Sequence, residues 1–220
     1  MALQEIKPIE NKHFNYESIV FSIILASLMF VMGFLISYTV SYSQYKDLKL
    51  DQDNMKYDLL SFQVENQLLG DSCELLNPYR FASEMDDMGL KISILEKSFG
   101  KQDSKVIEKK EIYSILEAQH FLYIKDINTK CNKNINTLLF FYSNNENEAT
   151  DGELYGTIIS ALKSNNNDLM VYSFDYWLDT PIVNLMKTKY NVTIPNTIII
   201  NEKTKLTNIK NIKDIQIYLK

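Results

Sequence analysis

One long apolar run stands out near the start of the chain. Ile19–Val40 reads IVFSIILASLMFVMGFLISYTV and contains no charged residue. As a helix with a rise of ~1.5 Å per residue it would extend about 33 Å, enough to cross a hydrocarbon core of roughly 30 Å. Tyr16 and Tyr42 flank the run, as aromatic residues do at membrane interfaces. The pattern predicts a transmembrane helix over residues 19–42, preceded by an N-terminal tail over residues 1–18.

A cleaved signal peptide is the alternative to an anchor. Its apolar region would span only ~7–15 residues and would follow a basic start. Here the run is longer, and the leader MALQEIKPIENKHFNYES has mixed charge. We therefore expect an uncleaved anchor that contacts membrane lipid through residues 19–42.

A polar, helix-like stalk follows over residues 43–130. Hydrophobic residues recur in it at seven-residue spacing, at Leu48, Met55, Phe62 and Leu69. Such a seam is typical of a coiled coil, although polar residues interrupt its companion positions. Because the seam covers only about four heptads, we favour packing on helices of the same chain, with a homodimer through the stalk as the alternative.

Two further helices are expected within the stalk region. Asn77-Pro78 has the form of an N-cap followed by proline at the first helical position. After the break GKQDSK, Asp103 or Ser104 is expected to cap the next helix. The apolar stripe of that helix comprises Ile112, Leu116, His120, Tyr123 and Ile127. In such a stripe, His120 is expected to be a packed, hydrogen-bonded core residue rather than a metal ligand.

From residue 131 the pattern changes to short apolar strands that alternate with helices. Strands are expected at 137–143, 168–175 and 196–201, with a hairpin partner in KTKLTNI. Helices are expected at 151–164, from Thr180-Pro181 to about Tyr190, and in the final NIKDIQIYLK. The order β-α-β-α-β-β-α predicts an α/β domain over residues 131–220, in which helices cover a sheet and the first two strands are parallel neighbours.

That element order, with Pro195 just before the third strand, resembles the thioredoxin fold. Residues 131–220 are similar to membrane-anchored thioredoxin-like proteins of archaea in the segments LLFFYSN, LMVYSFDYWLD, LMKTKYNV and IPNTIIIN. The resemblance implies a cis-proline at Pro195, facing the start of the domain's first helix, where relatives carry a CxxC motif. It also implies a groove beside Pro195 that could bind an extended polypeptide.

The redox motif itself is absent. Aligned on YSN and on Gly156, the two cysteine positions fall at Ala149 and Gly152, in the segment ATDG. Thiol exchange needs a thiolate at the helix N-terminus, which neither alanine nor glycine supplies. We therefore expect no redox chemistry at this loop, and we assign it no catalytic residue, no metal and no cofactor.

The two cysteines of the chain, Cys73 and Cys131, are too far apart in sequence for a CxxC or zinc motif. An even pair on a membrane-anchored chain is typical of an oxidising exterior, so we favour a structural disulfide between them over two unrelated thiols. The same argument favours an extracytoplasmic C-terminal domain. Lysines occur on both sides of the apolar run and do not decide its orientation.

Charge and composition narrow the class of function. The net charge of −5 supplies no basic stripe for nucleic acid. Asp175 and Asp179 are four positions apart, but Asp179 or Thr180 is expected to cap the helix that Pro181 begins. The acidic loop from Glu146 to Glu153 is interpreted as a solvated helix start rather than a calcium site.

Three hypotheses for function remain. The favoured one is a redox-inactive, single-pass thioredoxin-like protein that acts in protein binding or assembly. The second is a thiol–disulfide oxidoreductase that uses Cys73 and Cys131 or a partner's thiols. The third is a structural coiled-coil subunit of a membrane complex.

Overall fold

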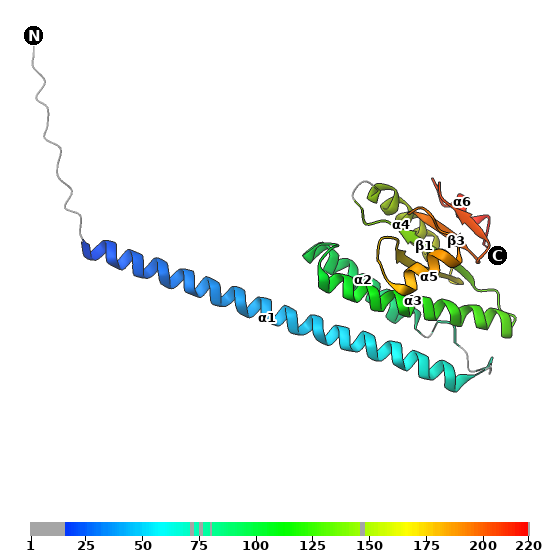
Figure 1. Ribbon diagram of the computed structural model, residues 1–220, viewed down its shortest axis with the longest axis horizontal. Helices are drawn as coiled ribbons and strands as arrows, with labels where there is room; N and C mark the ends of the chain where they lie inside the picture. The colour runs from blue at the N-terminus through cyan, green and yellow to red at the C-terminus, as the bar shows by residue number, and fades with distance from the viewer. Residues whose placement is uncertain (1–15, 71–72, 75–76, 80, 146–147, 220) are drawn as a thin grey trace, which may run out of the picture. The chain divides into compact units, whose positions relative to one another are not determined.

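The computed structural model describes residues 16–70, 73–74, 77–79, 81–145 and 148–219 (Figure 1). The chain divides into two compact units, residues 1–51 and residues 52–220. Its helices and strands, in order, are α1 (Tyr16–Leu69), α2 (Ala82–Phe99), α3 (Ser104–Lys130), β1 (Asn136–Tyr142), α4 (Ala149–Ser164), β2 (Leu169–Asp175), α5 (Pro181–Lys189), β3 (Thr197–Ile200), β4 (Thr204–Leu206) and α6 (Lys213–Gln216).

In the first unit, the described residues belong to the N-terminal part of α1. Tyr16–Val40 is long and apolar enough to cross a membrane, with a mean hydropathy of 2.8. Two of its polar side chains are satisfied within the helix. The hydroxyls of Ser22 and Thr39 donate to backbone carbonyls of the preceding turn, at 2.8 and 2.9 Å. This part of α1 therefore has the length and composition expected for the predicted membrane span.

In the second unit, the seam of the stalk turns toward the rest of the chain. Met55 and Phe62 are buried. The Phe62 ring contacts the rings of Phe81 and Tyr123, with centroids 4.7 and 5.5 Å apart. The favoured alternative, packing on helices of the same chain, is confirmed for these two seam positions. The side chains of Leu48 and Leu69 lie outside the described part.

The helix predicted from Asn77-Pro78 begins later than expected, at Ala82. The Asn77 side chain accepts a hydrogen bond from the Tyr79 backbone N–H at 3.0 Å, so it caps a turn rather than the helix. Asp103 caps α3 as predicted, because its carboxylate accepts from the Lys105 backbone N–H at 2.9 Å. All five residues of the predicted α3 stripe are buried.

The four strands form one small mixed sheet in the order β2-β1-β3-β4. β1 and β2 are parallel, from the pair Asn136 and Leu169 to the pair Tyr142 and Asp175, which confirms the predicted neighbours. β3 pairs antiparallel with β1 on one side and with β4 on the other. β2 therefore forms one edge of the sheet, and the short β4 forms the other.

Helices cover both faces of the sheet (Figure 1). Leu139, Phe141 and Tyr172 share one core with buried residues of α3 and α5. Phe140 and Ile198 belong to a second core that contains buried residues of α4 and α6. Since the first core joins α2 and α3 to the sheet, these helices belong to the same compact unit as the strands, whereas the sequence predicted a boundary after residue 130.

The final helix is shorter than predicted, because α6 spans only Lys213–Gln216. The Asp214 carboxylate accepts hydrogen bonds from the backbone N–H groups of Lys210 and Asn211, at 2.8 and 3.1 Å. These bonds hold the preceding segment in a turn and compete with a longer helix.

Candidate functional site

Polar side chains gather where the parallel strands β1 and β2 end. Ser143 and Asn144 follow β1 directly, and Asp175 is the last residue of β2. The carboxyl ends of parallel strands lie at the same edge of a sheet, which is where open α/β sheets place their sites. A cavity of about 870 Å³ opens at this edge and is lined by Asn144, Asp175 and Trp177, together with residues of the α2–α3 connection.

Four side chains near this edge form what we name the strand-end cluster: Ser143, Glu148, Trp177 and Asn196. The Trp177 indole N–H lies 3.0 Å from both the Ser143 hydroxyl oxygen and the Glu148 carboxylate. The Ser143 hydroxyl donates to the same carboxylate at 2.6 Å. Trp177 remains 55% exposed. The indole is thus held in a fixed position with much of its ring surface open to solvent.

Asn196 ties the start of α4 to the end of β1. Its amide oxygen accepts from the Ser143 backbone N–H at 3.1 Å, and its amide nitrogen donates to the Glu148 carbonyl at 2.9 Å. A Cβ placed on Gly152 would lie 3.1 Å from that amide oxygen and 3.3 Å from the Ser143 carbonyl oxygen. The amide therefore fills the space that a side chain at position 152 would need.

Next to this cluster is a second group of side chains, which we name the buried ion network: Glu96, Lys110, Asn144 and Asp175. The Lys110 ammonium pairs with Asp175, and with Glu96 at 3.1 Å. The Asn144 amide donates to Glu96 at 3.1 Å and to Asp175 at 3.0 Å. The network joins α2 and α3 to the carboxyl ends of β1 and β2, and sequence reasoning missed it because its members are far apart in the chain.

The predicted degenerate redox positions lie beside the strand-end cluster. Ala149 is the first residue of α4, and Gly152 lies buried in its first turn. Pro195 precedes Asn196, whose side chain contacts the segment leading into α4. Asn196, the residue after Pro195, therefore lies next to the start of α4.

The expectation of a cis-proline at Pro195 requires correction. The described part of the chain contains no cis peptide bond, so the bond before Pro195 is trans. The chain turns into β3 through Asn196, which has a φ of 53° in the left-handed region. Asparagine tolerates this conformation better than most residues. The Thr197 hydroxyl, which donates to the Ile194 carbonyl at 2.8 Å, closes the turn.

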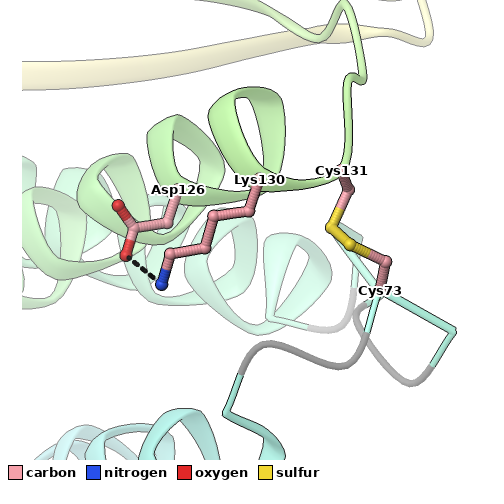
Figure 2. The surroundings of a disulfide bond; sticks show 4 residues. All are labelled: Cys73, Asp126, Lys130 and Cys131. Atoms are coloured by element: carbon pink, nitrogen blue, oxygen red, sulfur yellow. Dashed lines mark ion pairs between the residues drawn. A yellow bond between two sulfur atoms is a disulfide. The ribbon is translucent and has the colours of Figure 1, made fainter.

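Cys73 and Cys131 are joined by a disulfide, with Cα atoms 5.5 Å apart, as predicted (Figure 2). Cys131 follows the last turn of α3, where Lys130 and Asp126 form an ion pair at 3.7 Å. The bond lies before β1, whereas Ala149 follows β1. A strand of 7 residues extends about 23 Å, so the disulfide lies near the opposite end of β1 from the strand-end cluster.

The remaining predicted residues have structural roles. Thr180 caps α5, and Asp179 accepts from the Asn184 amide at 2.7 Å. The described residues contain no group of three or more His, Cys, Asp or Glu side chains arranged to hold a metal ion. Glu146 lies outside the described residues.

His120 is a packed core residue, as expected. Its Nδ1 lies 2.9 Å from the Tyr172 hydroxyl. Burial disfavours the charged imidazolium and lowers the pKa of His120 from 6.5 to about 4. A base with a depressed folded pKa contributes stability that is present above its unfolded pKa and is lost as pH falls toward the folded value.

We therefore expect His120 to make the second unit sensitive to acid. Between pH 7 and pH 4.5, protonation of His120 should lower the free energy of unfolding by about 2 kcal/mol. In His120→Gln, which keeps a polar group near Tyr172, this share of the acid sensitivity should disappear. Urea titrations followed by the fluorescence of Trp177, the single tryptophan of the chain, measure both proteins. Equal acid sensitivity of the two would contradict the assignment.

Comparison of the chain with protein-family models, with curated proteins and with solved structures finds no match in any of the three.

Proposed function

We propose that this chain is a membrane-anchored thioredoxin-like module without redox activity, which binds an extended polypeptide beside Pro195. The element order β-α-β-α-β-β-α, with parallel β1 and β2 and an antiparallel β3–β4 pair, supports the thioredoxin-like fold. The apolar helix Tyr16–Val40 supports the membrane anchor. The disulfide supports an extracytoplasmic position for the C-terminal part.

The observation that carries the proposal is the Asn196 amide beside Gly152. At the position where redox relatives need a cysteine side chain, a Cβ would already lie 3.1 Å from this amide. The amide is fixed by two hydrogen bonds to the backbone of the β1–α4 connection. The amide therefore occupies the space beside Gly152 that a reacting thiol would need, and it is held there by Ser143 and Glu148.

The same region presents apolar surface to solvent. We name the exposed area formed by Trp177, Ile194 and Pro195 the Trp177 surface. Ile194 is 51% exposed. The Tyr176 hydroxyl donates to the Thr193 carbonyl at 3.0 Å, and the Tyr176 and Trp177 rings are in contact, so the two segments of the surface are linked. A fixed, half-exposed indole is the kind of anchor that polypeptide-binding surfaces use.

Binding can be followed directly, because Trp177 is the single tryptophan. The full chain in detergent micelles is titrated with reduced, carboxymethylated ribonuclease A, an unfolded polypeptide that lacks tryptophan. We expect the Trp177 emission to shift to shorter wavelength with saturable dependence on the probe, because the bound polypeptide excludes water from the indole. In Ile194→Asp the affinity should fall at least tenfold, since a charge replaces apolar contact surface.

The matched control is Leu122→Asp on α3, where the side chain is 49% exposed and does not belong to the Trp177 surface. This variant should bind as the wild type does. If the probe leaves the emission unchanged, or if Ile194→Asp and Leu122→Asp weaken binding equally, the Trp177 surface is not a polypeptide-binding site.

A further inference from the structure

A second cavity, of about 470 Å³, lies beside the outer edge of β2, between α2, α3 and α4. We name it the β2-edge cavity. Its charged and phenolic lining residues include Asp86, Glu96, Lys110, Tyr113, Glu117 and Lys163. The volume is within the range of small-molecule sites in proteins.

Glu117 is the central acidic group of this cavity. The side chain is buried, with 1% of its surface exposed. One carboxyl oxygen accepts a hydrogen bond from the Ser173 backbone N–H at 2.6 Å. This bond gives a partner to a backbone N–H on the outer edge of β2. The other oxygen, Oε2, has no hydrogen-bond partner among the residues that the structure describes. An unpaired buried carboxyl oxygen is costly, and it lines a cavity that can hold a partner.

Two helix-interior glycines border the cavity, and one of them, Gly156, leaves it wider. Gly89 of α2 and Gly156 of α4 both line it, although glycine costs a helix roughly 1 kcal/mol relative to alanine. A Cβ on Gly89 would lie 3.0 Å from the Tyr113 hydroxyl oxygen. A Cβ on Gly156 would meet no atom within 4 Å. At Gly156, then, the missing side chain leaves open space rather than relieving a close contact.

The charges around the cavity leave Glu117 without a cationic partner of its own. Lys110 is engaged by Glu96 and Asp175. Lys163 is engaged by Asp86, with contacts of 2.5 and 2.7 Å to its two carboxyl oxygens. The lining thus contains more carboxyl groups than lysines. Tyr142 also lines it and already holds the Lys110 ammonium 5.7 Å from its ring centroid, a contact that favours positive charge.

We propose that the β2-edge cavity binds a small organic ammonium ion, whose positive charge pairs with Glu117. The ammonium N–H groups would donate to Oε2, the unpartnered oxygen, while Ser173 keeps its bond to Oε1. The tyrosine rings would contact the hydrocarbon part of the ligand. This site is independent of the Trp177 surface, and neither proposal requires the other.

Binding at this site is coupled to a proton. Burial raises the pKa of Glu117 well above its usual value; the Ser173 N–H and Lys163 on α4 oppose this rise, and Asp86 on α2 adds to it. Glu96, Lys110, Tyr113 and Asp175 complete the charged and titratable groups that line the cavity beside Tyr142. At a pH below this raised pKa the free carboxyl group holds a proton, which it releases to solvent when the ammonium binds. Below the pKa of Glu117, affinity should rise about tenfold for each unit of pH.

The test is a calorimetric titration of the full chain in detergent micelles with butylamine, and with butanol as the neutral analogue. We expect saturable binding of butylamine that strengthens with pH, with little binding of butanol. Repeating the titration in buffers of different ionisation enthalpy should show the released proton. In Glu117→Gln, which keeps an acceptor for the Ser173 N–H, butylamine affinity should fall at least tenfold and no proton should be released.

Gly156→Leu is the second variant, in case Glu117→Gln alters folding. It keeps the carboxyl group and fills the cavity from α4, so it should abolish butylamine binding while the urea unfolding transition is retained. The proposal is overturned if the wild type does not bind butylamine, if butanol binds equally well, or if affinity does not depend on pH. It is equally overturned if a folded Glu117→Gln or Gly156→Leu protein binds as the wild type does.

Discussion

Replacing Lys110 with methionine is expected to lower the free energy of unfolding of the second unit by about 3–5 kcal/mol. Lys110 is only 5% exposed and pairs with both Glu96 and Asp175, which are 16% and 8% exposed. Methionine fills a similar volume but leaves two poorly solvated carboxylates without their cation. The loss should therefore come from the stranded acidic groups rather than from a packing defect.

Urea unfolding followed by Trp177 fluorescence measures this effect, and Lys163→Met provides the matched control. Lys163 pairs with Asp86 at the protein surface, with the two side chains 35% and 59% exposed, so its replacement should cost less than about 1 kcal/mol. Adding Asp175→Asn to Lys110→Met should recover part of the loss. If Lys110→Met and Lys163→Met lose similar free energies of unfolding, the buried ion network stabilises the unit no more than a surface ion pair does.

Removal of the disulfide should have an effect of comparable size. Cys73 and Cys131 enclose a sequence separation of 58, and the chain-entropy model assigns such a loop about 4 kcal/mol of stabilisation. The double variant Cys73→Ser, Cys131→Ser should lose up to this amount in urea unfolding. Reduction of the wild type should give the same shift in the transition, because both treatments free the same loop.

A double variant as stable as the oxidised wild type would contradict a structural role for this bond. The same proteins separate the proposed function from the oxidoreductase hypothesis. In an insulin reduction assay the wild-type chain should show no activity above that of the added dithiol, since its cysteines lie at the opposite end of β1 from the degenerate positions Ala149 and Gly152. Activity that disappears in the serine variant would support the oxidoreductase hypothesis instead.

Much of the architecture could be predicted from local pattern. The strand 137–143 is a short apolar run and the strand 168–175 shows partial alternation, and the structure places β1 and β2 within one residue of them. The α3 stripe was predicted correctly because a helix that packs on a core needs apolar residues at intervals of three and four. Thr180-Pro181 marked the start of α5 through cap chemistry, which depends only on neighbouring residues.

The candidate sites were harder to predict, since each joins residues that are distant in sequence. Asn196 contacts Ser143 and Glu148 across the sheet, and neither its type nor its spacing indicates this role. In the sequence, Glu117 looks like an ordinary polar residue of a long helix, yet its side chain is buried against the edge of β2. The prediction of a cis-proline at Pro195 was wrong, because the chain turns through Asn196 in the left-handed conformation. The resemblance to a fold does not indicate which residue makes this turn.

By itself the sequence determined the apolar helix, the order of helices and strands, the parallel β1–β2 pair and the absence of cysteine at positions 149 and 152. These follow from periodicity, length and residue type, which act over a few neighbouring residues. Only the tertiary structure decided that the stalk seam packs inward, that Lys110 pairs with the two poorly solvated carboxylates of Glu96 and Asp175, and that Glu117 faces a cavity. Burial and pairing depend on which distant segments meet, and the energy of a charged group depends on that environment more than on its own identity.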